Sequence, residues 1–518
     1  MGKVGNISTT SIRDAIRLGC HTIGNVLNAD DSYFPFFGSV VRPDVRLGWG
    51  LESDIPGRHL DALLNAEDAA VVPVDEDVVE KEASALFFSY TGPVSLPLHR
   101  DKIDGPLFYL SPHMPRQSMH GLRALVKYRR SAKAQELAER TIAAIFDLWD
   151  PENDWDRNRI EKLGLKFVDM TFIQGLGRAI GPLVEYYRAT GYGPALDLAV
   201  VLKDRALRDF FTEAGTYDAE LFGYHCHSTT CVMSSLAQLA ALTRDASLMK
   251  RVKRFYDNGL WDIRDEVGCV IESSRPDGDP DRGEGNNTGD VIEAALILGR
   301  WGHTEYYQDA EQILRSYLLP SQLRDNSFII DPPNPGNEDG KHDVARRHLG
   351  AFGFAAPYGH APLDSKRVSF NMDIVGGVVG SLCEVYRELT RFDGAGHWVN
   401  FLFDHETDAI QVESPYTNPC LRVRIKRPGS LFVRIPSWVD EQAVEVKGIT
   451  GTPRHNNGYL FVAAPPVDTP ISIAFPLPVR DITLKHRTRD IRARLRGDEV
   501  VAMDNFGADL TFFDPYED

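Results

Sequence analysis

A unit of two consecutive helices recurs along most of the chain and limits the folds open to it. Apolar stripes with a helical period open near Gly57, His120, Gly177, Met233, Asp290 and Gly376. Second helices follow over 133–149, 192–211, 246–256 and 305–318, after short turns with Gly, Asp or Lys. Four of the six openings lie about 57 residues apart, longer than a solenoid repeat of about 34 to 47 residues. Six such hairpins predict a closed (α/α)6 toroid.

The pattern changes to short strands after Trp398. Segments that alternate apolar with polar residues, or are β-branched, occur at 421–425, 431–435, 443–446, 459–462 and 471–475, with turn signals between them. We therefore expect a mainly helical protein with a β domain, divided into a toroid over 1–398 and a β-sandwich over 399–518. Residues 1–55 carry an aromatic, glycine-rich segment, and the first 30 residues can complete the toroid or pack against the sandwich, which the sequence leaves open.

Charge and composition exclude several classes of partner. The chain has 57 basic and 74 acidic residues, a net charge of −17, which disfavours nucleic acid and anionic membranes. An anionic substrate would require a local cluster of Arg or Lys. The first residues lack the apolar core of a signal peptide, and no apolar run reaches about 18 residues. We expect a cytoplasmic protein, and assembly into a homo-oligomer is left open.

The stretch over 268–300 concentrates the candidate chemistry. Glu272 and Glu284 flank a loop rich in Gly, Asp and Pro, which leads into an amphipathic helix expected to begin near Thr288 or Asp290. Asp290 precedes the apolar stripe and is first interpreted as a residue of the helix N-terminus. Loops held between rigid elements often carry catalytic groups, so both glutamates are candidate catalytic residues.

Several segments resemble one family of carbohydrate enzymes. They are the helix starting at HCHSTTC (225–231), the stretch GCVIE (268–272), the loop GEGNN (283–287) and the strand LFVRIPSW (431–438). Together they resemble the β-L-arabinofuranosidases of glycoside hydrolase family 127, over roughly residues 35 to 478. The resemblance implies an (α/α)6 barrel followed by a β-sandwich, with a glycosidase pocket at one mouth of the barrel.

The resemblance also implies roles for single residues. Family members hold a zinc ion with three cysteines and a glutamate, and one of these cysteines is the nucleophile. Glu272 matches their acid/base glutamate and Glu284 their metal-binding glutamate, whereas Asn286 and the segment 370–373 stand where cysteines are expected. Without thiolates we expect no metal and no cofactor. A glycosidase of this kind must then use carboxylates, and Glu284, Asp373 and Asp290 are candidates to partner Glu272.

Further residues are candidates for holding a carbohydrate substrate. His225 and His227 precede a helix and are expected to point to opposite sides of an extended segment, and Asn286 lies beside Glu284. The loop 341–360 is expected close to Asp373, with candidates Arg346, His348, Tyr358 and His360. Two alternatives remain beside a zinc-independent glycoside hydrolase that releases a terminal sugar. One is a lyase acting on a uronate-containing saccharide with His227, Tyr358, His348 and Arg346, and the other is a non-catalytic sugar-binding protein.

Overall fold

Twelve helices form two concentric rings in the computed structural model, which describes residues 2–50, 55–363, 365, 367–485 and 489–517. The inner ring consists of α2 (Ile55–Ala70), α4 (Met114–Arg129), α7 (Ile180–Thr190), α10 (Cys226–Thr243), α12 (Gly285–Arg300) and α15 (Met372–Glu388). Each inner helix packs against the next, and α15 returns to α2, so that the ring is closed. The predicted (α/α)6 toroid is therefore confirmed.

The outer ring alternates with the inner one along the chain. Its helices are α1 (Ile12–Asn25), α3 (Glu76–Phe88), α5 (Ala132–Leu148), α8 (Gly193–Asp209), α11 (Ala246–Asp257) and α13 (Glu305–Ile313). Helix α1 packs against α15 and α2 and completes this ring, so the N-terminal segment belongs to the toroid. The shorter helices are α6 (Arg157–Lys162), α9 (Ala219–Phe222) and α14 (Val344–Arg347), and none of the helices in the described part of the chain is long and apolar enough to span a membrane.

Glycines bring the inner helices into close contact. A Cβ atom on Gly121 of α4 would lie 2.7 Å from the Cα atom of Gly57 in α2. In α15, a Cβ atom on Gly377 would lie 1.8 Å from Asn286 Oδ1 and 2.2 Å from Arg58 Nη2. The missing side chain at Gly377 thus leaves room for polar groups on the barrel axis.

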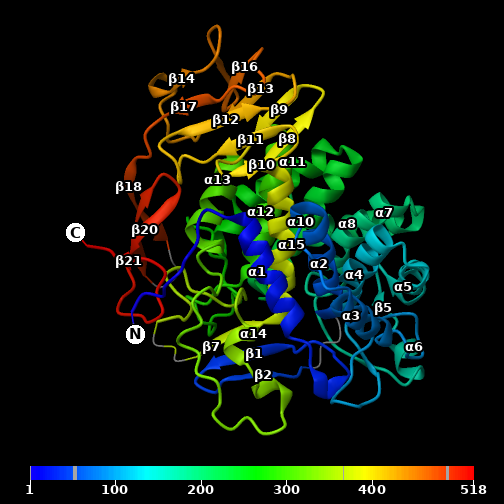
Figure 1. The fold of residues 1–518 in the computed structure, drawn as a ribbon. Helices are drawn as coiled ribbons and strands as arrows, with labels where there is room; N and C mark the ends of the chain where they lie inside the picture. Colours follow the sequence, from blue (N-terminus) through cyan, green and yellow to red (C-terminus); the bar gives the residue numbers. More distant parts are fainter. Residues whose placement is uncertain (1, 51–54, 364, 366, 486–488, 518) are drawn as a thin grey trace.

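Two five-stranded sheets pack together beyond the C-terminal ends of the inner helices (Figure 1). One contains β10 (His405–Glu406), β11 (Ile410–Glu413), β12 (Leu421–Ile425), β17 (Ile471–Ala474) and β14 (Glu445–Lys447). The other contains β15 (Arg454–Asn456), β16 (Tyr459–Val462), β13 (Leu431–Arg434), β9 (Gly396–Val399) and β8 (Thr390–Asp393). Their apolar faces enclose a separate core. The first strand of this sandwich begins at Thr390, ahead of the boundary placed after residue 398.

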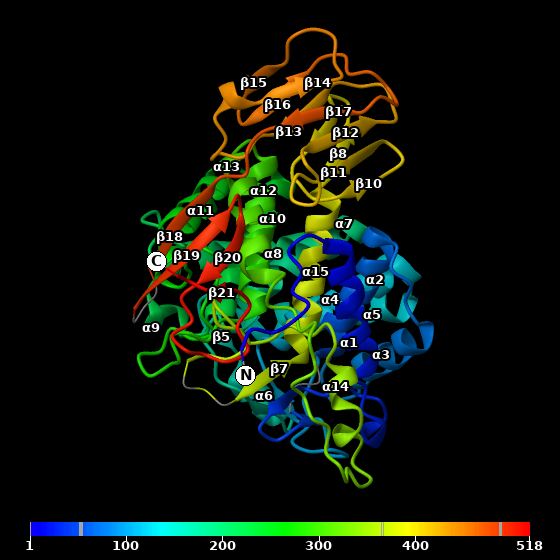
Figure 2. The same cartoon turned by 60° about the vertical axis from the view of Figure 1, so that its left-hand side comes forward.

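The last strands leave the sandwich and line the side of the barrel (Figure 2). They are β18 (Val479–Lys485), β19 (Asp490–Arg496), β20 (Glu499–Met503) and β21 (Asp514–Pro515). Leu484, Ile491 and Leu495 of this four-stranded sheet are buried in the same apolar core as the helices. The C-terminal region is thus a sandwich plus one sheet that belongs to the packing of the barrel.

A three-stranded sheet covers part of the opposite mouth, where the inner helices begin (Figure 1). Its order is β2 (Arg46–Gly48), β1 (Gly38–Arg42) and β7 (Val368–Asn371), all antiparallel. Since β7 leads directly into α15, this sheet is attached to the N-terminal end of an inner helix. Two small ribbons complete the secondary structure, β3 (Tyr109–Leu110) with β6 (Lys166–Phe167) and β4 (Trp149–Asp150) with β5 (Asp154–Trp155).

Candidate active site

A short hairpin presents Glu272 and Glu284 on the same face at the mouth where the inner helices begin. Ile271 and Gly283 form an antiparallel bridge, Glu272 N–H donates to the Arg282 carbonyl over 2.8 Å, and Glu284 N–H donates to the Val270 carbonyl over 3.0 Å. In this register Glu272 lies opposite Arg282, and Glu284 is its diagonal neighbour. Residues related in this way share a face and lie about 7 to 8 Å apart.

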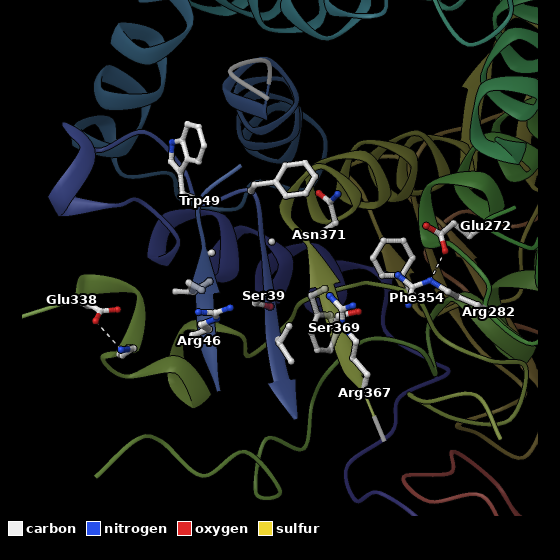
Figure 3. Close-up of a pocket in the computed structure, with 17 residues that line it drawn as sticks. Ser39, Arg46, Trp49, Glu272, Arg282, Glu338, Phe354, Arg367, Ser369 and Asn371 are labelled. Carbon is white, nitrogen blue, oxygen red and sulfur yellow. Dashed lines mark hydrogen bonds and ion pairs between the residues drawn. The ribbon is translucent and has the colours of Figure 1, made fainter. Parts of the chain in front are cut away.

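Glu272 lies at one end of a cavity of about 630 Å³ (Figure 3). The floor of the cavity is the sheet of β2, β1 and β7, and its aromatic lining consists of Phe37, Trp49, Phe354 and Phe370. Arg282 Nε donates to Glu272 Oε2, and the guanidinium of Arg282 lies 3.7 Å from the ring centroid of Phe354. The ion pair fixes the orientation of the Glu272 carboxylate while one third of its side chain, 33 %, stays exposed.

Glu284 is the N-cap residue of α12 and lies deeper than Glu272. Only 4 % of this residue is exposed, and burial raises the pKa of Glu284 to about 8, with further increases from the charges of Glu272 and Asp373. The positive end of the α12 dipole favours the ionised form, but the loss of hydration outweighs it. Glu284 therefore holds a proton at neutral pH.

Two histidines contact Glu284. His225 Nε2 lies 3.8 Å from Glu284 Oε2, and His227 Nδ1 lies 3.4 Å from Glu284 Oε1. His225 is the N-cap of α10 and its side chain is 40 % exposed, so solvent reaches the neighbourhood of Glu284. His227 is buried, and burial together with Arg178 lowers its pKa well below the usual range, so its imidazole is neutral. His227 belongs to the first turn of α10 rather than to an extended segment, which corrects that expectation.

Asp373 is held on the barrel axis by two hydrogen-bond donors and one ion pair. Gln117 Nε2 donates to its Oδ1 over 2.9 Å, Asn286 Nδ2 donates to its Oδ2 over 2.9 Å, and Arg58 Nε lies 3.5 Å from its Oδ1. Asn286 Nδ2 also lies 3.5 Å from Glu284 Oε1, so it connects the two carboxyl groups. Each oxygen of Asp373 thus accepts one hydrogen bond, which fixes the orientation of its carboxylate.

One group of three potential metal ligands exists among the described residues: His225, His227 and Glu284, with ligand atoms within 4.8 Å of one another. Two histidines and a glutamate bind zinc in some hydrolases. Here, however, Arg178 Nη2 donates to His227 Nδ1 over 3.1 Å. The guanidinium occupies the lone pair that a metal needs, and its charge repels a cation. Asn286 and Asp373 hydrogen-bond to each other, so their positions do not fit a zinc–thiolate centre either.

Four residues of the loop 341–360 lie away from the cavity, which corrects the expectation that they line it. Arg346 donates to Asn25 Oδ1 of α1, and Tyr358 donates to Asp281. His348 and His360 are buried beside Phe370, with ring centroids 5.7 Å and 6.3 Å from the Phe370 ring. These side chains stabilise the region behind the sheet of β2, β1 and β7.

Asp290 is also placed differently from the expectation. Helix α12 begins at Gly285, so Asp290 lies inside the helix, where it accepts a hydrogen bond from Thr230 Oγ1 over 2.9 Å. Asp290 Oδ2 lies 3.6 Å from His227 Nε2. It therefore supports His227 from the barrel axis and does not cap the helix.

Comparisons with known proteins support the fold. No family model matches the sequence, and no curated protein matches it. Among solved structures, a family 127 β-arabinofuranosidase superimposes with a TM-score of 0.60 at 13 % identity, covering 94 % of this chain and 79 % of the other. The family 127 β-L-arabinofuranosidase Ara127N from Geobacillus stearothermophilus T6 gives 0.59 at 15 % identity, with coverages of 96 % and 85 %. The chain thus shares its fold with glycoside hydrolases.

Proposed function

We propose that this protein is a zinc-independent glycoside hydrolase that releases a terminal sugar, with Glu272 and Glu284 as its acid and base. The observation that carries the proposal is the pair of glutamates on one face of the hairpin, one exposed in an ion pair and one buried with its pKa raised to about 8. Pairs of carboxyl groups whose surroundings separate their protonation states are typical of acid/base catalysis. The fold shared with glycoside hydrolases is consistent with this role.

The surroundings of the two groups favour a division of roles. Glu284 carries a proton at neutral pH and donates it to the glycosidic oxygen as the bond to the leaving group breaks. Glu272, held in place by Arg282, accepts a proton from the water that attacks the anomeric carbon. This assignment reverses the role that the family resemblance implies for Glu272. Inverting enzymes have carboxyl groups about 6.5 to 9.5 Å apart, and the diagonal register of the hairpin suits that spacing.

The polar network around Glu284 supports the same proposal. His227 and Asn286 contact the buried carboxyl group and restrict its orientation, while the exposed side chain of His225 is available to a sugar hydroxyl. Asp373 positions Asn286. No step in this mechanism passes through a metal ion.

The lyase alternative finds less support. The side chains of Arg346, His348 and Tyr358, three of the four considered for it, already make hydrogen bonds to other residues of the protein. His227 is neutral and could accept a proton, but it is buried and its Nδ1 already accepts a hydrogen bond from Arg178.

The test is product analysis on a panel of aryl glycosides and oligosaccharides. We expect reducing sugar without new ultraviolet absorption, and we expect turnover to be lost in Glu272→Gln and in Glu284→Gln. Glu305→Gln, an exposed change at the start of α13, serves as the matched control. An unsaturated, ultraviolet-absorbing product would establish the lyase instead, and binding of sugars without any turnover would leave only the non-catalytic alternative.

A further inference from the structure

The positive charges of the side chains that line the cavity outnumber the negative charges. The cationic side chains among the described residues that line it are Arg46, Arg282, Lys341 and Arg367, and the carboxylates are Glu272 and Glu338. Each carboxylate is already neutralised, Glu272 by Arg282 and Glu338 by Lys341, whose Nζ lies 2.7 Å from Glu338 Oε1. Arg46 and Arg367 have no side-chain hydrogen bond or ion pair with any residue that the structure describes.

The sheet register brings these two arginines to one surface. Val40 of β1 faces Arg46 of β2 on one side and Ser369 of β7 on the other, so the three side chains form a row on one face. Arg367 lies two residues before Ser369. Because neighbouring strands are about 4.8 Å apart, the Cα atoms of Arg46 and Ser369 are separated by about 10 Å, a distance that two long side chains can bridge. Both arginines lie over this sheet, between Glu338 at one end and Glu272 at the other (Figure 3).

The next row of the same face leaves space for a ring. Gly48, Gly38 and Asn371 lie opposite one another there, so two of the three positions have no side chain. Trp49 and Phe37 border this bare part of the floor. A sugar ring that rests there has an aromatic wall beside it and a positively charged surface one row away.

We infer that the substrate is an acidic saccharide, whose carboxylate is bound by Arg46 and Arg367. The inference rests on the proposed function, since it treats the cavity beside Glu272 as the substrate site. In a chain with a net charge of −17, two arginines that have no partner among the described residues provide in one cavity the local cluster that an anionic substrate requires. A guanidinium group binds a carboxylate through two parallel hydrogen bonds, which favours a uronic acid over a neutral sugar.

The test compares saccharides that differ only in charge. Oligogalacturonide, oligoglucuronide and oligomannuronate are each titrated beside their methyl esters, with binding measured by calorimetry. The protein is the full chain carrying Glu284→Gln, which is expected to slow turnover and replaces a carboxyl group that holds a proton at neutral pH with a neutral amide. We expect at least one acid to bind more tightly than its ester by about tenfold, the usual effect of a hydrogen-bonded charge pair.

Two double variants separate the cavity from the overall charge. Adding Arg46→Gln and Arg367→Gln is expected to abolish the preference for the acid. Adding Arg422→Gln and Arg427→Gln, at exposed positions of the sandwich with the same change in charge, is expected to preserve it. Equal binding of acid and ester in all three pairs would overturn the inference, as would a preference that survives the loss of Arg46 and Arg367.

Activity of the wild type and of the two arginine changes distinguishes failure of this inference from failure of the hydrolase proposal. A preference for the acid that depends on the two arginines, together with a wild-type protein that cleaves no glycoside of the panel, would support the acidic ligand and refute the hydrolase. Hydrolysis of neutral glycosides by the wild type, at a rate that Arg46→Gln and Arg367→Gln in an otherwise wild-type chain do not change, would support the hydrolase and refute the acidic ligand.

Discussion

Glu272 and Glu284 share a backbone hairpin but differ in their surroundings. Glu272 is exposed to the cavity and paired with Arg282, whereas Glu284 is buried between two neutral groups, His227 and Asn286. A carboxyl group that must donate a proton at neutral pH needs a raised pKa, and a group that accepts one needs to be ionised and accessible. The two positions meet these different requirements.

Replacement of the two glutamates should therefore have different consequences. We expect Glu284→Gln to reduce kcat by about 10²- to 10⁴-fold on natural glycosides, the range for loss of a general acid. The loss should be smaller for aryl glycosides with good leaving groups, because these need little protonation. Glu272→Gln should reduce the rates of both substrate types by a similar factor, and steady-state kinetics on matched substrates provides the measurement. If Glu272→Gln instead shows the strong leaving-group dependence, the roles of the two residues are exchanged.

The pH dependence of kcat/KM offers a second test at the residue scale. Since Glu284 must be protonated and burial raises its pKa to about 8, the rate should fall as the pH rises through this value. A pH–rate profile on a natural glycoside, whose leaving group needs protonation, should show this alkaline limb in the wild type, and the residual rate of Glu284→Gln should not show it. A wild-type rate that stays level beyond pH ~9 would contradict the assignment of the proton to Glu284.

Sequence patterns identified Glu272, Glu284, His225, His227, Asn286 and Asp373, and the fold brings most of them into one network. They did not identify Arg58, Gln117 or Arg178, which hold Asp373 and His227 in place. These three come from separate helical segments, and each looks like an ordinary polar residue of a helix. The four residues of the loop 341–360 were predicted to line the cavity but do not line it. A run of His, Arg and Tyr among glycines is equally compatible with buried structural contacts.

At the scale of the element, helix α12 begins earlier than the helix propensities of its first residues predict. Gly285, Asn286 and Asn287 are poor helix formers, and their stretch was expected to be a loop. In the structure they form the first turn, since Asn287 Nδ2 donates to the Ile271 carbonyl over 2.8 Å and Asn286 is fixed by Asp373. Tertiary hydrogen bonds thus extend the helix to Glu284. The sheet of β2, β1 and β7 was missed because it joins segments from opposite ends of the toroid.

Asp290 in α12 should make stability depend on pH. Burial raises the pKa of Asp290 from 3.8 to about 6, so the native state keeps this proton at pH values where the unfolded chain has lost it. The resulting stabilisation is fully present below pH 3.8 and is lost as the pH rises through about 6. For Asp290→Asn we expect the fall in unfolding free energy over this range to be smaller by about 2 to 3 kcal/mol.

Urea unfolding at several pH values between these limits provides the measurement. Asp204→Asn, a change at an exposed position of α8, is the matched control and should retain the wild-type slope. The same slope in Asp290→Asn and in the wild type would show that Asp290 is ionised in the native state.

At the scale of the whole molecule, the spacing of apolar stripes was sufficient to predict ring closure. Six inner helices separated by similar lengths of chain can bury their apolar faces only against one another and an outer ring. The strands after Trp398 were predicted from their alternation, but β18 to β21 pack on the barrel rather than on the sandwich. Alternation identifies the buried face of a strand and not the surface that covers it.

The absence of a zinc–thiolate centre is a prediction about the entire purified protein. Elemental analysis should find no stoichiometric zinc, and prolonged chelation should leave activity unchanged. The physical reason is that Arg178 occupies His227 Nδ1, while Asn286 and Asp373 bind each other. One zinc per chain, removed by a chelator together with activity, would contradict this account.

The stereochemistry of hydrolysis tests the central claim most directly, because it depends on both glutamates acting on one anomeric carbon. Proton NMR can follow the first-formed anomer released from the glycoside of the panel that is cleaved fastest. The diagonal register of Glu272 and Glu284 leaves room for a water molecule between the sugar and Glu272, so we predict that the first product has inverted configuration. A first product of retained configuration would contradict the role of Glu272 as a general base that activates water.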